Sequence, residues 1–280
     1  MNALTSLLTP APAGALPATA ARTTGATAGQ EMPLPRILRA YLAETRFELL
    51  RMTRAVAFII GLLALPVPLY LLFGVVIAGQ DKHPGTGDYL FLGFATMAVI
   101  GPAIFGVGCS LAVEREQGLL RLKRALPVPA GAYLLSKVLM QLVFAAAAAG
   151  SVAVAALLCG KITLHLPQVL AVIGVLTLGT LPFCTLGLYI GTRCSGAAAP
   201  GFSNLVYLPM LYLSGVFFPL PGALAAWSVI WPTFHLEQLA YAAAGLKQFL
   251  YFPSAMSLVF LAGVTVLFGG LALRRLARIG

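Results

Sequence analysis

The segment from Glu114 to Pro129, EREQGLLRLKRALPVP, holds the densest group of chemically active side chains in the sequence. Its first eleven residues include six charged ones, in a chain of which only 9% is charged. Carboxylates followed by a cluster of guanidinium and ammonium groups can pair with oppositely charged partners or take part in acid–base chemistry. The choice between these roles depends on other chemical signatures and on the elements that hold the charges.

No signature of an enzyme accompanies them. The sequence has no GxSxG nucleophile pattern, no HExxH metal pattern and no GxxxxGK[ST] phosphate loop. Its four cysteines lack CxxC spacing and mostly fall in apolar runs, and loop polarity explains its three histidines better than metal ligation does. We therefore expect a non-catalytic chain that binds no metal or cofactor itself. If the protein uses ATP, another chain must bind it.

The composition is that of an integral membrane protein, because 60% of the 280 residues are hydrophobic. A helix needs about 20 apolar residues to cross a bilayer, so uninterrupted apolar runs of that length predict spans. Their continuity excludes the alternating pattern of a β-barrel. The sequence predicts an all-α integral membrane protein with six transmembrane helices, at about residues 55–79, 89–113, 138–159, 168–190, 198–218 and 254–273.

Basic residues concentrate on one side of these spans. Fifteen of the 18 Lys and Arg residues flank one side, and only Lys82, Lys161 and Lys247 fall on the other. The positive-inside rule places both termini and the Glu114–Pro129 segment in the cytoplasm. No aromatic-interleaved surface suggests nucleic acid, so we expect these charges to face anionic lipid headgroups and an acidic protein partner.

Three segments lie outside the spans. Residues 1–32 are rich in Ala, Thr, Pro and Gly and predict a disordered cytoplasmic tail before a membrane domain at 33–280. From Pro33 to Arg54 the helical spacing of apolar residues predicts an amphipathic interfacial helix, the alternative being a simple basic flank. Pro219 to Pro253 is too interrupted to cross the membrane, and we expect an external re-entrant helical hairpin there.

The charged segment itself predicts a short cytoplasmic helix over residues 115–126, between the second and third spans. Its leucines share one face. Glu114 and Glu116 would stand at its N-terminus, where the helix dipole favours anions, and Pro127 would end it.

Ionisable side chains are missing from the interior of the predicted spans. Asp88 and Lys137 lie at span ends, and Glu237 falls in the predicted hairpin. Carriers driven by ion gradients usually place such groups within the membrane, so a secondary carrier is disfavoured.

The pattern E-R-E-x-G, followed by a leucine-rich basic helix, L-P-V-P and a span that opens YLLSKVL, resembles the cytoplasmic signature of the type-2 ATP-binding-cassette (ABC) permeases. The stretch YLSGVFFPL at Tyr212 to Leu220, with His235 behind it, resembles the segment of that family that leads from the fifth span into the outer hairpin. The likeness covers about residues 33–278. One departure is Leu119, where many members carry Thr, which alters the capping of the helix.

This resemblance implies a permease subunit that dimerises and contacts a separately encoded ATPase subunit, which binds ATP and Mg. It also implies that the loop between the second and third spans forms a coupling helix seated in a groove of the ATPase, with the N-terminal helix as a second contact. The role would be docking and force transfer; the alternative is a charged turn that only fixes topology. The candidate coupling residues are Glu114, Arg115, Glu116, Gly118, Arg121 and Arg124.

The translocation path is expected between the two permease copies, lined by the second and fifth spans. Polar residues of the fifth span are candidates, although hydrogen bonding between helices explains them equally well. Gly187 and Gly191 have the GxxxG spacing that permits close helix contact. The candidate lining residues are Ser203, Asn204, Tyr207, Tyr212 and Ser214.

Together these features predict an ABC-type permease that exports an amphipathic, lipid-like or drug-like substrate from a prokaryotic cell. It would work as a homodimer in the inner (plasma) membrane. The rival interpretation is a non-transporting membrane scaffold or assembly subunit that recruits a cytoplasmic partner.

Overall fold

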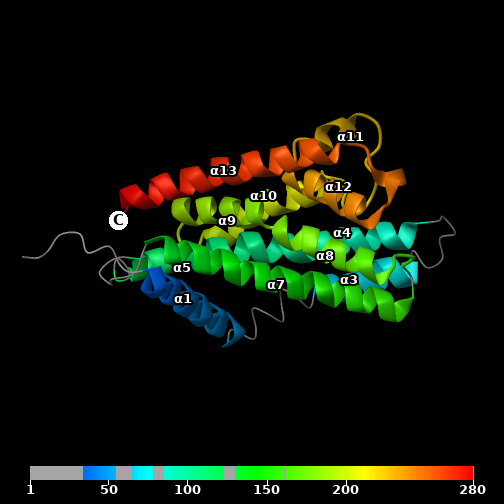
Figure 1. Ribbon diagram of the computed structural model, residues 1–280. Coiled ribbons are helices and arrows are strands. Elements are labelled where there is room, and N and C mark those ends of the chain that lie inside the picture. The colour runs from blue at the N-terminus through cyan, green and yellow to red at the C-terminus, as the bar shows by residue number, and fades with distance from the viewer. Residues whose placement is uncertain are drawn as a thin grey trace, which may run out of the picture. The chain divides into compact units, whose positions relative to one another are not determined.

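The computed structural model describes residues 34–54, 65–77, 85–120, 122, 130–160 and 162–279. Within these ranges every regular element is a helix and no strand occurs, which confirms the predicted all-α class (Figure 1). The predicted tail at 1–32 lies outside the described residues, as do Arg121 and Arg124.

Four helices of the described chain are long and apolar enough to cross a membrane. They are Thr86–Glu116, Tyr133–Cys159, Leu166–Arg193 and Ser254–Arg278, and they contain the predicted second, third, fourth and sixth spans. A chain with four such helices is a multi-pass membrane protein.

The predicted first and fifth spans are represented by shorter helices. An apolar helix of Pro66–Ile77 is made of α3 (Pro66–Tyr70) and the π-helical segment η1 (Leu71–Ile77). The helix α10 (Ala199–Tyr212) has 14 residues. Residues 55–64 and 78–79 of the predicted first span lie outside the described residues, and α10 is shorter than the about 20 residues that a crossing takes, so the count of six spans stays a prediction.

The second span lies at the centre of the packing. It runs through α4 (Thr86–Gly101), the π-helical η3 (Pro102–Gly106) and α5 (Val107–Glu116), and 94% of its most apolar stretch is buried. The π-helical turn begins at Pro102, which has no backbone N–H to offer to the regular helical ladder.

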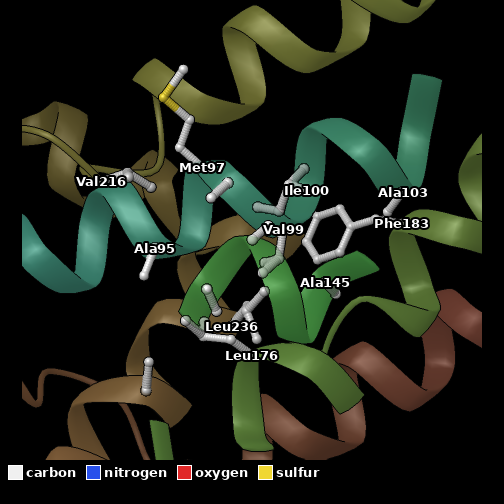
Figure 2. Packing of buried hydrophobic residues seen from close by; sticks show 14 of the residues in the cluster. Ala95, Met97, Val99, Ile100, Ala103, Ala145, Leu176, Phe183, Val216 and Leu236 are labelled. Carbon is white, nitrogen blue, oxygen red and sulfur yellow. The ribbon is translucent and has the colours of Figure 1, made fainter. Parts of the chain in front are cut away.

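Neighbouring helices surround this span. They are α7 (Ala130–Cys159), α8 (Leu166–Leu178), α9 (Leu181–Arg193) and α12 (Pro232–Ala244). The last helix, α13 (Ser254–Ile279), packs on α9 and α12. Figure 2 shows where several of them meet: Val99 and Ile100 of α4 lie beside Phe183 of α9, above Leu176 of α8 and Leu236 of α12. All five side chains are fully buried.

Glycines let α9 approach the second span closely. A β-carbon added at Gly187 would lie 2.8 Å from the carbonyl oxygen of Ile104, and one added at Gly191 would lie 2.5 Å from that of Gly108. Real β-carbons do not come so near to backbone oxygen, so these positions accept only glycine without rearrangement. The close helix contact predicted from the GxxxG spacing is confirmed, and its partner is the second span of the same chain, η3 at Gly187 and α5 at Gly191.

Helices also form in the two segments expected outside the spans. The N-terminal helix α1 (Leu34–Arg54) lies within the segment predicted from Pro33 to Arg54 and packs on α7 (Figure 1). Between residues 219 and 253 the chain forms α11 (Ala223–Ser228), α12 and the 3₁₀ turn η4 (Lys247–Phe249). The helix α11 is largely exposed, whereas α12 packs against α8, α13 and α4. The placement of both segments relative to a membrane stays a prediction.

Candidate functional site: the charged end of the second span

The first three charged residues of the Glu114 segment end the second span; they do not begin a new helix. The α5 helix continues through Glu116, and Gly118 then adopts a left-handed φ of +72°. Glycine enters that conformation at little cost and commonly ends helices. A new turn starts there, since the Leu122 N–H donates to the Gly118 carbonyl at 3.2 Å. The prediction that Glu114 and Glu116 stand at a helix N-terminus was therefore wrong.

This geometry changes the electrostatics of the two carboxylates. The C-terminal end of a helix carries partial negative charge, which disfavours an acidic side chain. Glu114 is also only 2% exposed, so water can hardly solvate its negative charge. A buried carboxylate in this position needs cationic partners.

Glu114 finds those partners on two other helices. The ammonium of Lys137 lies 3.0 Å from its Oε1, the guanidinium of Arg51 pairs with the same oxygen, and the Tyr133 hydroxyl donates to Oε2. Lys137 also lies 2.7 Å from Glu48 Oε1. We call Glu48, Arg51, Glu114, Tyr133 and Lys137 the charge cluster; its two carboxylates and two cations balance.

The charge cluster joins three helices that are distant in sequence. Glu48 and Arg51 are one turn apart on α1, at 3.7 Å, and Tyr133 and Lys137 are one turn apart on α7. Lys137 is completely buried and also donates to Ser110 Oγ of α5 at 3.2 Å. The end of the second span is thus held to α7 by a buried ion pair, and to α1 by an ion pair with Arg51, whose side chain is 45% exposed.

Arg115 points away from the charge cluster, toward the end of α9. Its guanidinium donates to the carbonyl oxygen of Thr192 and, at 2.6 Å, to that of Cys194. Arg275 of α13 donates to the same Thr192 oxygen at 3.1 Å. The last carbonyls of a helix have no partner within it, and they attract cations. Arg115 therefore ties α5 to the C-terminal end of α9, to which Arg275 also ties α13.

The rest of the segment is more accessible. Glu116 is exposed beside Gly196, and Leu122 is 62% exposed. Gly118 has no neighbour within 4 Å of an added β-carbon. Of the predicted coupling residues within the described chain, Glu114 and Arg115 thus make internal contacts, whereas Glu116 and the turn after it face outward.

Sequence reasoning did not find the other four members of the charge cluster. A signal was present, because Lys137 follows YLLS at the opening of a long apolar run. A charged residue next to a membrane span calls for a partner, and Glu48 on the preceding amphipathic helix is acidic among arginines. The pairing itself could not be found without knowing which helices are neighbours.

The candidate lining residues of the fifth span divide into two groups. Ser203, Tyr207 and Ser214 are buried, and the Tyr207 ring packs edge-on against Phe105 of η3 at 5.5 Å between centroids. Asn204 and Tyr212 are exposed, Tyr212 by 58%. The second and fifth predicted spans are therefore in contact inside one chain. Of the five candidate lining residues, Asn204 and Tyr212 are the two that lie on the open face of α10.

His235, at the start of α12, is held by protein groups. One ring nitrogen lies 2.8 Å from the Val229 carbonyl oxygen and the other 3.2 Å from Ser257 Oγ, while the ring stacks on Phe260 at 4.0 Å. Burial lowers its pKa. Across the part of the chain that the structure describes, no group of three His, Cys, Asp or Glu side chains could hold a metal ion.

Comparison with known proteins identifies the family. The profile of the ABC-2 type transporter family matches residues 39–250, from α1 through the charge cluster to η4. The chain is also 26% identical over 200 residues to a Bacillus subtilis (strain 168) protein named "Putative transport permease YvfS", an alignment that covers 69% of this chain and 81% of that relative. These matches confirm the resemblance that the E-R-E-x-G pattern indicated. The chain belongs to the ABC-2 type transporter family.

Proposed function

We propose that this chain is the transmembrane permease subunit of an ABC exporter, which moves an amphipathic, lipid-like or drug-like substrate with ATP hydrolysed on a separate ATPase subunit. Family membership supports the class of protein. The observation that carries the coupling role is the charge cluster, which links the end of the central span to α1 and α7 directly beside an outward-facing turn.

The charge cluster and Arg115 make this end of the molecule a rigid joint. A displacement of the turn at Gly118 acts on Glu116 and, through the α5 backbone, on Glu114 and Arg115. Glu114 passes the displacement to α1 and α7, and Arg115 passes it to the end of α9, which Arg275 links to α13. Buried ion pairs suit this task, because separating them leaves uncompensated charges in a medium of low dielectric constant.

The docking contact itself is assigned to Glu116, which is exposed, and to two arginines that follow the Gly118 turn in the sequence. Glu116, Arg121 and Arg124 are the residues that we propose to meet an ATPase groove, with ATP and Mg bound there and not by this chain. Glu114 and Arg115 act behind them as positioning residues. This arrangement gives the permease no catalytic group of its own.

The proposal also covers the oligomeric state, the membrane location and the translocation path of the exporter. The chain would work as a homodimer with six spans, in the inner membrane of a prokaryote and with both termini in the cytoplasm. The open face of α10 would border the path between two copies, so Asn204 and Tyr212 are its candidate lining residues. The apolar character of that face, with Leu205 69% exposed, favours an amphipathic substrate over an ion.

Reconstitution with the partner ATPase tests this function. Purified permease and ATPase in lipid vesicles are expected to move amphipathic dyes across the bilayer when ATP is supplied, and transported dyes should stimulate hydrolysis. A scaffold subunit would bind the ATPase without either effect. That result, in vesicles where the complex is shown to be intact, would contradict the proposal.

A further inference from the structure

A buried acid lies at the centre of α12, in the segment that follows α10. Glu237 is 2% exposed. Its Oε1 accepts a hydrogen bond from the Tyr241 hydroxyl at 2.9 Å, one turn further along the helix. Neither residue has a part in the coupling site described above, so the presence of this carboxyl group needs its own explanation.

Aromatic rings from two other elements surround the Glu237–Tyr241 pair. Tyr89 of α4 stacks on Tyr241 with 5.9 Å between centroids, and Phe249 of η4 packs on both rings at 5.3 and 5.4 Å. The Tyr89 hydroxyl donates to the Gly215 carbonyl oxygen, just beyond α10. The carboxyl group is therefore enclosed where α12 meets the start of the second span.

No cation of the described chain pairs with Glu237. Among the elements packed on α12, η4 carries Lys247, which is exposed, and α13 has no titratable residue before Arg274. The carboxylate of Asp88 in α4 is occupied by two hydrogen bonds from Thr163, at 2.8 and 2.5 Å. The remaining titratable groups on these elements are Tyr89 of α4, His165 at the start of α8, Tyr207 and Tyr212 of α10, and His235 and Tyr241 of α12 itself.

A carboxyl group without a cation or water is more stable when it is neutral. Burial raises the pKa of Glu237 to about 8, and the hydrogen bond from Tyr241 opposes this effect in part. At neutral pH the group thus holds a proton. An acid that carries a proton inside the protein but would lose it in water links protonation to packing.

We propose that Glu237 is a proton-binding site that controls the packing of α12: with the proton bound, α12 is held against α4 and α13, and loss of the proton loosens α12 together with the adjoining α11. The site lies outside the charge cluster, and it does not depend on which substrate the permease moves.

The direction of the pH effect follows from the two protonation states. When α12 is loosened and the carboxyl group meets water, its pKa returns to the ordinary value of 4.5. The packed state therefore binds the proton more tightly. Its advantage is complete below pH 4.5, decreases as the pH rises, and is lost by the time the pH has passed about 8.

The two tryptophans of the chain are placed to report this change. Trp227 lies in α11, and Trp231 directly precedes α12. Tryptophan emission of the purified full chain in lipid nanodiscs, recorded from about pH 6 to about pH 9.5, avoids most of the ordinary tyrosine titration. We expect one transition with a midpoint near pH 8 in the native protein.

Two variants assign that transition to Glu237. Glu237→Gln keeps the size of the side chain without its titration, and its emission should stay at the low-pH value throughout. Tyr241→Phe removes a hydrogen bond that favours the carboxylate, so its midpoint should move to higher pH. Lys247→Gln, at an exposed site nearby, should leave the midpoint unchanged.

Clear outcomes overturn the proposal. The proposal is wrong if the tryptophan emission of the native protein stays constant between about pH 6 and about pH 9.5. It is also wrong if Glu237→Gln shows a transition with the same midpoint as the native protein. If Glu237→Gln does not fold, Tyr241→Phe decides: an unchanged midpoint means that another group titrates. A midpoint below pH 6.5 would point to His235, whose pKa is lowered from that value.

Discussion

Lys137 and Glu114 form an ion pair of 3.0 Å between side chains that are 0% and 2% exposed. They lie directly beside the predicted third and second spans, 23 residues apart, with the outward-facing turn between them. The pair therefore closes the base of the loop that the family resemblance assigns to coupling. The strength of the loop's attachment to the membrane helices depends on it.

Lys137→Met should destabilise the protein strongly. Methionine fills a similar volume but leaves Glu48 and Glu114 to share Arg51, which is 45% exposed at its side chain. Removing one partner of a buried ion pair costs about 3–5 kcal/mol. Thermal denaturation in detergent measures the loss, with Lys247→Met at an exposed site as the control.

A double variant separates charge from packing at this position. In Lys137→Met with Glu48→Gln one buried carboxylate is neutralised, so the loss should be smaller than in Lys137→Met alone. A double variant that is less stable by the sum of both single effects would show that the charges do not interact.

Arg115 is expected to stabilise the fold through geometry as well as charge. Arg115→Lys keeps the positive charge, but a single ammonium does not reproduce a guanidinium that spans the carbonyl oxygens of Thr192 and Cys194. We expect a loss of about 1–3 kcal/mol, because buried carbonyls at the end of α9 lose a donor. Chemical denaturation should show it; stability equal to that of the native protein would mean that charge alone suffices.

The contact between α5 and α9 gives a prediction with a matched control. Gly191→Ala places a methyl group 2.5 Å from the Gly108 carbonyl oxygen, so the helices must separate, and overpacking of this kind costs about 1–3 kcal/mol. Gly174→Ala in α8 has nothing within 4 Å of the new β-carbon. It should be neutral or slightly stabilising, since alanine favours helix more than glycine does. Equal denaturation midpoints of the two variants would contradict this packing.

Long apolar runs and close-contact glycines could be predicted from the sequence because both depend on local properties. Hydropathy alone locates the helices at Thr86–Glu116 and Ser254–Arg278, and the spacing of Gly187 and Gly191 indicates a helix contact. The direction in which Glu114 points could not be predicted. It depends on α5 continuing to Glu116 and on two partners, 63 and 23 residues away, that only the packed helices bring together.

The burial of Glu237 likewise could not be predicted from the sequence. The residue falls within FHLEQLAY, a stretch of the predicted external hairpin, and nothing in these neighbouring residues indicates that the glutamate is buried. The structure buries it because α12 is covered by α4, α8 and α13, elements that come from three separate parts of the chain. A polar residue in a moderately apolar helix thus has no fixed exposure until its neighbours are known.

The docking role of the two arginines that follow the Gly118 turn in the sequence is tested by reversing their charge. In the double variant Arg121→Glu, Arg124→Glu the positive charges that we propose to meet an acidic ATPase groove become negative, and like charges at an interface weaken association. Co-purification of the ATPase with the permease should fall at least tenfold, and ATP turnover of the mixture should return to that of the free ATPase. The denaturation midpoint of the double variant is measured beside that of the native protein, so that a loss of binding is not mistaken for a loss of folding. Lys247→Glu, whose charge lies in the 219–253 segment, should leave complex formation intact. A double variant that still co-purifies with a fully active ATPase would show that these arginines are not the docking contact.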